Sequence, residues 1–212
     1  MKNKYNISCI ELERYMNNLI SPQLTRRVII GTKSKSRRSL FKGLNLKFNF
    51  RSANIQESKV SNLKNDKNDA VKIAIAKARH LSNKYKDKII ITFDTTILFR
   101  KKIIYKCQTP ECCIKLLCSL NNKNHFLYTG MIFMINNKII RKKLTKTKVN
   151  FGKNDKKKIK LYVKKNFGYI KDAVGCYNIE GSGIDLFKNI NKSYFNVLGL
   201  DIISFLKFMR KV

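Results

Sequence analysis

The sequence predicts an α/β domain with a mixed, twisted sheet, flanking helices and one long hairpin. Strand-like and helix-like segments alternate along the chain, a pattern typical of this fold class. Two long strand-like runs flank Asn136-Asn137, a dipeptide that favours a hairpin turn. The length of 212 residues and the hydrophobic share of 43% suit one core. We therefore predict an N-terminal extension at residues 1–26 and a single domain at residues 27–212.

The individual elements follow from the spacing of apolar residues. Runs rich in β-branched and aromatic residues predict strands over residues 28–31, 46–51, 89–93, 103–106, 125–136 and 138–149. Helical periodicity predicts helices over residues 37–44, 68–84, 110–120, 155–166 and 202–210, and a weaker one over residues 11–19. The chain has neither a run of about 18 apolar residues nor a signal-peptide core, so we expect no membrane span and a cytoplasmic location.

The charge of the chain is strongly basic. Lys and Arg number 46 against 13 Asp and Glu, which gives a formal charge of +33. Such a charge is typical of proteins that bind nucleic acid. Lys, Ile and Asn, however, share A/T-rich codons, so we favour a biased genome, without selection for a polyanion partner, as the source of the excess. A basic, ribosome-associated nucleic-acid-binding protein is therefore the alternative function, although we expect no specific nucleic-acid partner.

The six cysteines do not form a recognisable metal motif. They lie at positions 9, 107, 112, 113, 118 and 176, without a CxxC pair. Neighbouring helical residues point about 100° apart, so Cys112 and Cys113 suit no ordinary zinc knuckle. We predict reduced thiols that pack as small apolar residues.

Three segments could carry chemistry. "GTKSKSRRSL", residues 31–40, places hydroxyls and cations between a strand and a helix; it is a phosphate cradle, a piece of a nucleic-acid surface or a product of composition. Lys77 lies at the edge of an apolar helical stripe, so it must reach solvent or meet an anion. Asp94 follows a β-prone run; it either lies at the ligand-binding edge of the sheet or caps a turn.

Weaker candidates are Glu57 and Lys106, which follow or end other predicted strands. Glu180 lies in "GCYNIEGSGIDLF", a glycine-rich stretch that predicts a tight loop close to a ligand or to another strand. Each of these residues alone is more typical of ordinary surface or loop structure.

The order of these segments resembles the Maf family of nucleoside triphosphate pyrophosphatases, from about residue 28 to the end. "IIGTKSKSRRSLF" is similar to the family's "LASxSPRRxxLL" turn, and the family's "LAxxKA", "IGADT" and "GKP" motifs match residues 73–78, 91–95 and 105–107. The tail "GAYxIQGxG" matches residues 175–183. The family's "D-hydrophobic-D-E" piece matches residues 54–57, and the chain departs from the motifs at Lys35, Ser36, Gln56, Cys107 and Glu180.

The resemblance implies a two-lobed, inosine-triphosphatase-like architecture with a central cleft. It also implies hydrolysis of a nucleoside triphosphate, normal or modified, to a monophosphate and pyrophosphate, which clears unwanted nucleotides. A homodimer is compatible with it. Because Gln56 replaces an acid, an inactive homologue is also left open.

The resemblance further implies a role for each candidate residue. Asp94 would be the general base, and Glu57 and Asp94 would hold Mg²⁺ or Mn²⁺, which prefer oxygen ligands. Lys77 and Lys106 would clamp the phosphates, and Ser34 and Arg37 would bind them at the helix N-terminus. Glu180 resembles the branch that prefers a methylated guanosine triphosphate, whereas Asp94-Thr95 resembles the thymidine/uridine branch, so the base is left open.

Overall fold

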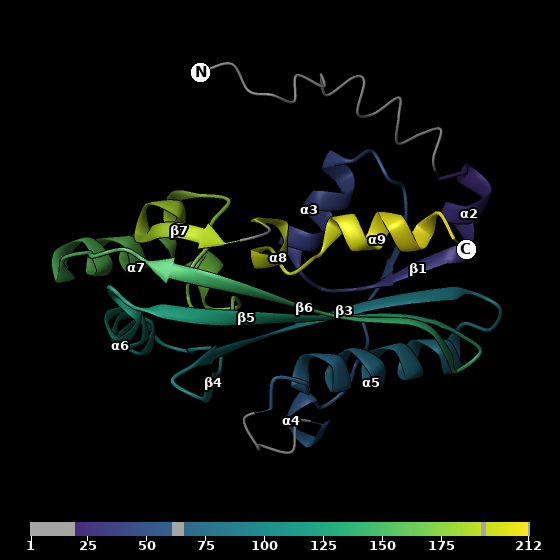
Figure 1. The fold of residues 1–212 in the computed structure, drawn as a ribbon, viewed down its shortest axis with the longest axis horizontal. Coiled ribbons are helices and arrows are strands. Elements are labelled where there is room, and N and C mark those ends of the chain that lie inside the picture. The colour runs from purple at the N-terminus through teal and green to yellow at the C-terminus, as the bar shows by residue number, and fades with distance from the viewer. Residues whose placement is uncertain (1–19, 61–65, 192–193, 212) are drawn as a thin grey trace.

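A computed structural model describes residues 20–60, 66–191 and 194–211. In these residues a seven-stranded sheet has the order β2 (Asn49–Arg51), β1 (Val28–Gly31), β3 (Ile89–Phe99), β5 (Asn124–Ile135), β6 (Lys138–Phe151) and β7 (Phe187–Asn191). The seventh strand, β4 (Lys102–Ile104), pairs with β3 and lies outside this order. Figure 1 shows α3 and α9 on one face of the sheet and α5 on the other. The predicted mixed α/β fold is confirmed.

The sheet is parallel at one side and antiparallel at the other. β1 pairs in parallel with β2 and β3, whereas β3, β5, β6 and β7 pair in antiparallel order. β5 and β6 form the predicted hairpin, and Asn136 and Asn137 at its turn have φ angles of 44° and 63°. A two-residue hairpin turn of this kind requires positive φ at both positions, which Asn tolerates better than most residues.

The five helices that the sequence predicts between residues 37 and 210 are present, with small shifts at their ends. They are α3 (Lys35–Gly43), α5 (Asp69–Lys84), α6 (Pro110–Leu120), α7 (Lys156–Ile170) and α9 (Ile202–Met209). Ser34, Thr109, Asp155 and Asp201 cap α3, α6, α7 and α9 with side-chain oxygens. The short elements were not predicted: α2 (Pro22–Arg27), α4 (Glu57–Val60), η1 (Ser182–Leu186), α8 (Tyr194–Val197) and β7.

Two groups of buried side chains fill the two ends of the long strands. One lies among α3, α9 and the parallel strands, with Phe41, Phe93 and Phe205 at its centre. The other lies among α6, α7 and the far ends of β3, β5 and β6, and it includes Leu117 and Ile159. Figure 1 shows β5 and β6 extending from α6 and α7 at one end to the level of α5 and α9 at the other. The long antiparallel strands therefore join the two halves of the molecule.

The N-terminal residues and the apolar character of the helices bear on two further predictions. The helix predicted over residues 11–19 lies outside the described residues, whereas α2 occupies the end of the predicted extension. Among the helices that the structure describes, none has the length and apolar character to cross a membrane.

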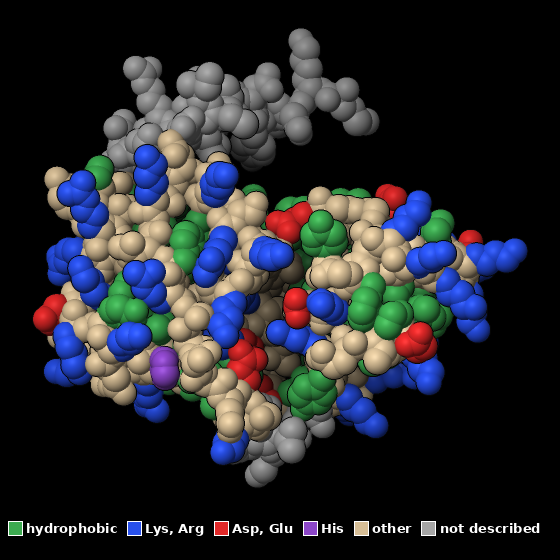
Figure 2. Space-filling model, turned by 180° about the vertical axis from the view of Figure 1, so that it is seen from behind, with side chains coloured by type: hydrophobic (Ala, Val, Ile, Leu, Met, Phe, Trp, Pro, Cys, Tyr) green, Lys and Arg blue, Asp and Glu red, His purple; other side chains and the backbone are tan. Residues whose placement is uncertain are grey.

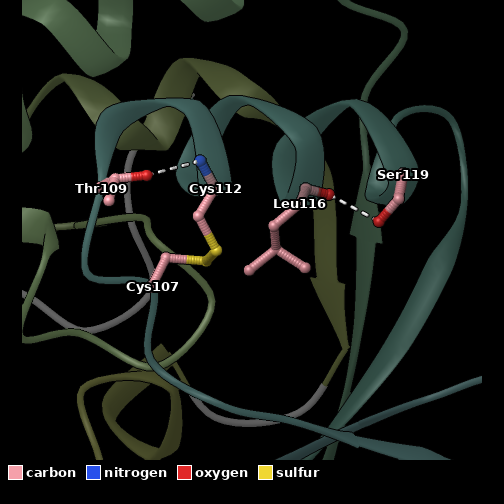
Figure 3. The surroundings of a disulfide bond; sticks show 5 residues. All are labelled: Cys107, Thr109, Cys112, Leu116 and Ser119. Atoms are coloured by element: carbon pink, nitrogen blue, oxygen red, sulfur yellow. Dashed lines mark hydrogen bonds between the residues drawn. A yellow bond between two sulfur atoms is a disulfide. The ribbon is translucent and has the colours of Figure 1, made fainter.

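The prediction of reduced cysteines is wrong for one pair. Cys107 and Cys112 form a disulfide at the start of α6 (Figure 3), while Cys113, Cys118 and Cys176 are free. A separation of five residues allowed this pairing because Thr109 caps α6 and turns the chain back between the two cysteines. Sequence spacing alone did not reveal that turn.

Candidate active site

Lys77 lies on α5 and is the centre of the candidate site. The buried face of α5, with Ala74, Ala78 and Leu81, packs on the sheet, and Lys77 stands at its edge with a side chain that is 14% exposed. Its ammonium lies 2.7 Å from Glu57 Oε1 and 2.7 Å from Asp94 Oδ1. Of the two sequence interpretations, the one in which Lys77 meets an anion is therefore correct.

Close packing of α5 against the sheet places this lysine over Asp94. The Thr92 hydroxyl donates to the Ala74 carbonyl at 2.6 Å, which fixes α5 on β3. Gly130 on β5 lies opposite Asp94, and a Cβ atom there would come within 2.6 Å of the Ala70 carbonyl oxygen. Any side chain at position 130 would thus push α5 away from the sheet.

Asp94 does not end a strand, which corrects the sequence prediction. β3 continues to Phe99, and Asp94 is in its middle. The parallel partner β1 ends at Gly31, which is in register with Thr92. Asp94 therefore stands just past the carboxyl end of β1, with a side chain that is 12% exposed. The expected ligand-binding edge is present, but the end of the neighbouring strand forms it.

The two carboxylates have pKa values displaced in opposite directions. Burial raises the pKa of Asp94, and the Glu57 charge adds to this, against the opposing effects of Lys77 and Arg37. Burial also disfavours ionised Glu57, but Lys77, Lys106 and Arg37 outweigh it and hold the pKa of Glu57 below its usual value. Paired carboxyl groups with opposite shifts are typical of sites where one accepts a proton and the other stays charged.

Lys106 joins the same cluster from the segment after β4. It is exposed, and its charge acts on Glu57. The described structure thus brings together four predicted residues that lie far apart in the sequence: Glu57, Lys77, Asp94 and Lys106. Figure 2 shows a hollow between the two halves of one face, with Lys and Arg side chains along it and Asp or Glu side chains within it.

Arg37 and Ser34 lie beside this cluster, in contacts that the sequence did not predict. Ser34 Oγ accepts a hydrogen bond from the Arg37 amide and caps α3. The Arg37 guanidinium donates to the Gly199 carbonyl at 2.6 Å, the Thr95 hydroxyl at 3.0 Å and the Phe93 carbonyl at 3.4 Å. Among the described residues these bonds engage three of its five N–H donors, so two can serve a ligand.

Gly199 and a chain of hydroxyl groups support Arg37. Gly199 has a φ of 87°, and a Cβ atom there would lie 2.8 Å from the guanidinium. The Thr95 hydroxyl also pairs with that of Thr129 at 3.0 Å, and Thr129 lies against the Asn196 carbonyl at 3.4 Å. These supporting residues were missed as site residues. Only Thr95 lies in a motif matched above, the segment similar to "IGADT".

Glu180 is not part of the Lys77 cluster. It is exposed, and its amide donates to Asn178 Oδ1 at 3.0 Å. Burial raises the pKa of Tyr194, and the nearby Glu180 charge adds to that shift. The Glu180 charge thus lies near Tyr194, away from the Lys77 cluster.

Comparison with known proteins assigns the family. The family model described as "Maf-like protein" matches residues 27–212. The chain belongs to the Maf-like protein family.

Curated relatives carry the names of two different activities. The chain is 31% identical over 182 residues to a dTTP/UTP pyrophosphatase of Clostridium botulinum (strain Okra / Type B1). The matched region covers 84% of this chain and 92% of that protein. The chain is 27% identical over 186 residues to a 7-methyl-GTP pyrophosphatase of Bartonella quintana, covering 86% and 94%. A dTTP/UTP pyrophosphatase of Pyrococcus furiosus is 34% identical over 155 residues, covering 73% and 80%.

Proposed function

We propose that this protein is a nucleoside triphosphate pyrophosphatase, a hydrolase that converts a nucleoside triphosphate to the monophosphate and pyrophosphate. The observation that carries the proposal is the position of Lys77 between Glu57 and Asp94, each 2.7 Å away. Membership of the Maf-like family and relatives named as pyrophosphatases of nucleotides support the same activity. The proposed role is the removal of unwanted or modified nucleotides.

The reaction needs an oriented water and neutralised phosphates. The water oxygen attacks the α-phosphorus, the bond from that phosphorus to the oxygen bridging to the β-phosphorus breaks, and pyrophosphate leaves. Asp94 accepts the proton of the water. Its raised pKa makes it a stronger base than an ordinary carboxylate, and the positive charges of Lys77 and Arg37 favour its ionised form.

The carboxylates also fit a hard divalent cation. Glu57 and Asp94 share one cation position in the structure, where the Lys77 ammonium binds oxygen atoms of both. We propose that these two residues hold Mg²⁺ or Mn²⁺, because both ions prefer oxygen donors. When bound, the ion supplies positive charge to the phosphate oxygens and lowers the pKa of bound water. Gln56, which replaces an acid of the family motif, offers only an amide oxygen.

Cations and a helix end provide the rest of the phosphate site. Lys77 and Lys106 neutralise phosphate charge, and the two N–H donors of Arg37 not engaged by the described residues form a planar fork for phosphate oxygens. The Ser34 hydroxyl and the N-terminus of α3 add donors beside them. Glu180, beside Tyr194, contacts the base in this proposal.

The activity test is a product assay across a panel of nucleotides. The purified protein is incubated with dTTP, UTP, 7-methyl-GTP and the common nucleoside triphosphates, with Mg²⁺, with Mn²⁺ or with a chelator. We expect pyrophosphate from at least one nucleotide, only in the presence of metal, and the panel identifies the base. Orthophosphate as the product, or no turnover on the whole panel, would contradict the proposal.

Location and assembly are part of the same proposal. We place the enzyme in the cytoplasm, with the nucleotides on which it acts, and as a homodimer, which the family resemblance allows. Cell fractionation and the mass of the purified protein in solution test these two statements.

A further inference from the structure

A second cluster of reactive side chains lies away from Lys77, in the half of the molecule formed by α6 and α7. The sulfur atoms of Cys107, Cys113 and Cys176 all lie within 4.8 Å of one another. All three side chains are buried, with exposed fractions of 4%, 0% and 0%. They come from three segments: the residues after β4, the first turn of α6 and the loop after α7. Three sulfurs from separate segments thus converge on one point.

A fourth sulfur stands at the same place. Cys112 is bonded to Cys107, so its sulfur adjoins the cluster, and Figure 3 shows it on the first turn of α6. Unlike the other three residues, Cys112 is exposed to solvent. The adjacent residues Cys112 and Cys113 point in different directions from the helix, but the sulfur of Cys107 is bonded to that of Cys112 and lies within 4.8 Å of that of Cys113. This answers the geometric objection that adjacent cysteines raise in the sequence.

The spacing of the sulfurs fits a thiolate-bound metal. A Zn–S bond of about 2.3 Å in a tetrahedron places the sulfurs roughly 3.8 Å apart, within the limit of 4.8 Å that the three buried sulfurs meet. Ordinary apolar packing is satisfied by any small side chain. Cys107 and Cys176 moreover stand where the family motifs have Pro and Ala, so two touching positions in separate motifs have both become cysteine.

We propose that, once the Cys107–Cys112 disulfide is reduced, Cys107, Cys112, Cys113 and Cys176 form a closed structural site for a thiophilic cation of the Zn²⁺ class. A small-molecule thiol or a dithiol protein supplies the two electrons and is itself oxidised to a disulfide. Each cysteine then binds the ion as a thiolate and releases its proton. The disulfide seen in the structure is the oxidised, metal-free form of the same cluster.

The site would brace two segments that carry candidate substrate residues. Lys106 directly precedes Cys107, and Glu180 lies on the same loop after α7 as Cys176. A metal bound to both cysteines would hold these segments against α6. This consequence rests on the proposed function, whereas metal binding itself does not, so the test measures metal content first.

The experiment uses the full-length, untagged protein, reduced with a phosphine and freed of metal with a chelator. Zn²⁺ is then titrated against a chromophoric competitor, and Co²⁺ is used as a spectroscopic probe. We expect one Zn²⁺ per chain and a Co²⁺ spectrum with thiolate charge-transfer bands and intense tetrahedral bands. The oxidised protein, whose Cys107–Cys112 disulfide is verified by mass spectrometry, should not bind.

Variants assign the ligands. Cys113→Ser and Cys176→Ser should lose stoichiometric binding, whereas Cys118→Ser, on the same helix but outside the cluster, should keep it. Because a buried serine can disturb folding, circular dichroism accompanies each variant, and the exposed Cys112→Ser provides a folded test that should bind more weakly. Glu57→Gln should bind Zn²⁺ as the wild type does, which separates this site from the carboxylates.

Three results would overturn the proposal. The first is that the folded, reduced wild type binds no stoichiometric Zn²⁺. The second is that Cys118→Ser loses as much Zn²⁺ binding as Cys112→Ser does. The third is a Co²⁺ spectrum that shows oxygen ligands only. A protein that binds Zn²⁺ at the sulfurs but hydrolyses no nucleotide would support this inference and sink the proposed function. The two proposals therefore fail separately.

Discussion

The two clusters of this molecule join distant segments by different chemistry. Around Lys77, ion pairs link α4, α5 and β3, and one of the paired carboxylates, that of Glu57, is 49% exposed. Around Cys113, sulfur atoms link three segments inside a buried core. A charged group near a core must have a partner, but a buried thiol is stable without one. The first cluster was therefore predictable from the sequence, and the second was not.

The largest expected effect is at Asp94. Asp94→Asn keeps the shape of the side chain but removes the proton acceptor, so turnover should fall by about 10²–10⁴-fold. The melting temperature should barely change, because burial already opposes the charge of Asp94. Asp155→Asn is the matched control: Asp155 only caps α7, and Asn caps equally well. Turnover of Asp94→Asn above about a tenth of the wild-type value would exclude Asp94 as the base.

The next effect tests the ion pairs. Lys77→Met leaves Glu57 and Asp94 without the ammonium that binds them both, although the charge of Arg37 still acts on each. We expect a loss of about 2–4 kcal/mol in the free energy of unfolding, less than for a fully buried pair because Glu57 is half-exposed. The loss should shrink as the pH falls and the carboxylates take up protons. Denaturant unfolding near pH 7 and pH 4 measures it, with the exposed Lys164→Met as the control. An equal loss at both pH values would contradict this account.

The half of the molecule formed by α6 and α7 contains a buried histidine, His125, which is neutral, unlike the charged groups around Lys77. Burial lowers the pKa of His125 from 6.5 to about 4, and its Nε2 pairs with the Tyr177 hydroxyl at 2.8 Å. The unfolded chain therefore binds a proton below about pH 6.5 that the folded chain does not, so stability is full above that pH and falls towards pH 4. We expect a fall of up to about 3 kcal/mol.

His125→Gln isolates the contribution of this histidine. Glutamine does not titrate, so the variant should show a flatter dependence of unfolding free energy on pH than the wild type. The carboxylates of the Lys77 cluster are the same in both proteins and cancel in the difference. Parallel profiles for the two proteins between pH 6.5 and pH 4 would show that His125 is protonated in the fold.

The smallest effect concerns nucleic acid, the partner that the charge of +33 first suggests. Figure 2 shows Lys and Arg side chains dispersed over the visible face instead of in one stripe. We expect weak binding that shows no sequence preference, and we expect this binding to be lost as the salt concentration rises from about 50 to 200 mM. Fluorescence anisotropy with RNA and DNA measures this. A complex with one sequence that persists at about 150 mM salt would favour the nucleic-acid function.

The long elements could be predicted because their apolar periods are regular. The hairpin turn at Asn136 and the amphipathic helix carrying Lys77 are local in origin, and both were found. β3 continues past Asp94 because it pairs there with β5 and then β4, whereas β1 ends opposite Thr92, and no local pattern encodes these pairings. Short elements such as β7 form only by pairing with β6.

Part of the candidate site could also be predicted, because some of its residues are conspicuous within their own segments. Glu57, Lys77 and Asp94 were found because charged residues stand out among apolar neighbours and match motifs in order. The contacts of Arg37 with Gly199 and Thr95 join segments up to 162 residues apart, and the meeting of Cys107 with Cys176 likewise depends on the folded topology. Such long-range contacts leave no local trace in the sequence.

Oxygen isotope labelling tests the central claim most directly. The nucleotide that is hydrolysed fastest is incubated in ¹⁸O-enriched water, and both products are analysed by mass spectrometry after a single turnover. Attack on the α-phosphorus, with Asp94 as the base, puts one ¹⁸O into the nucleoside monophosphate and none into pyrophosphate. Label in the pyrophosphate, or in released orthophosphate, would contradict the account.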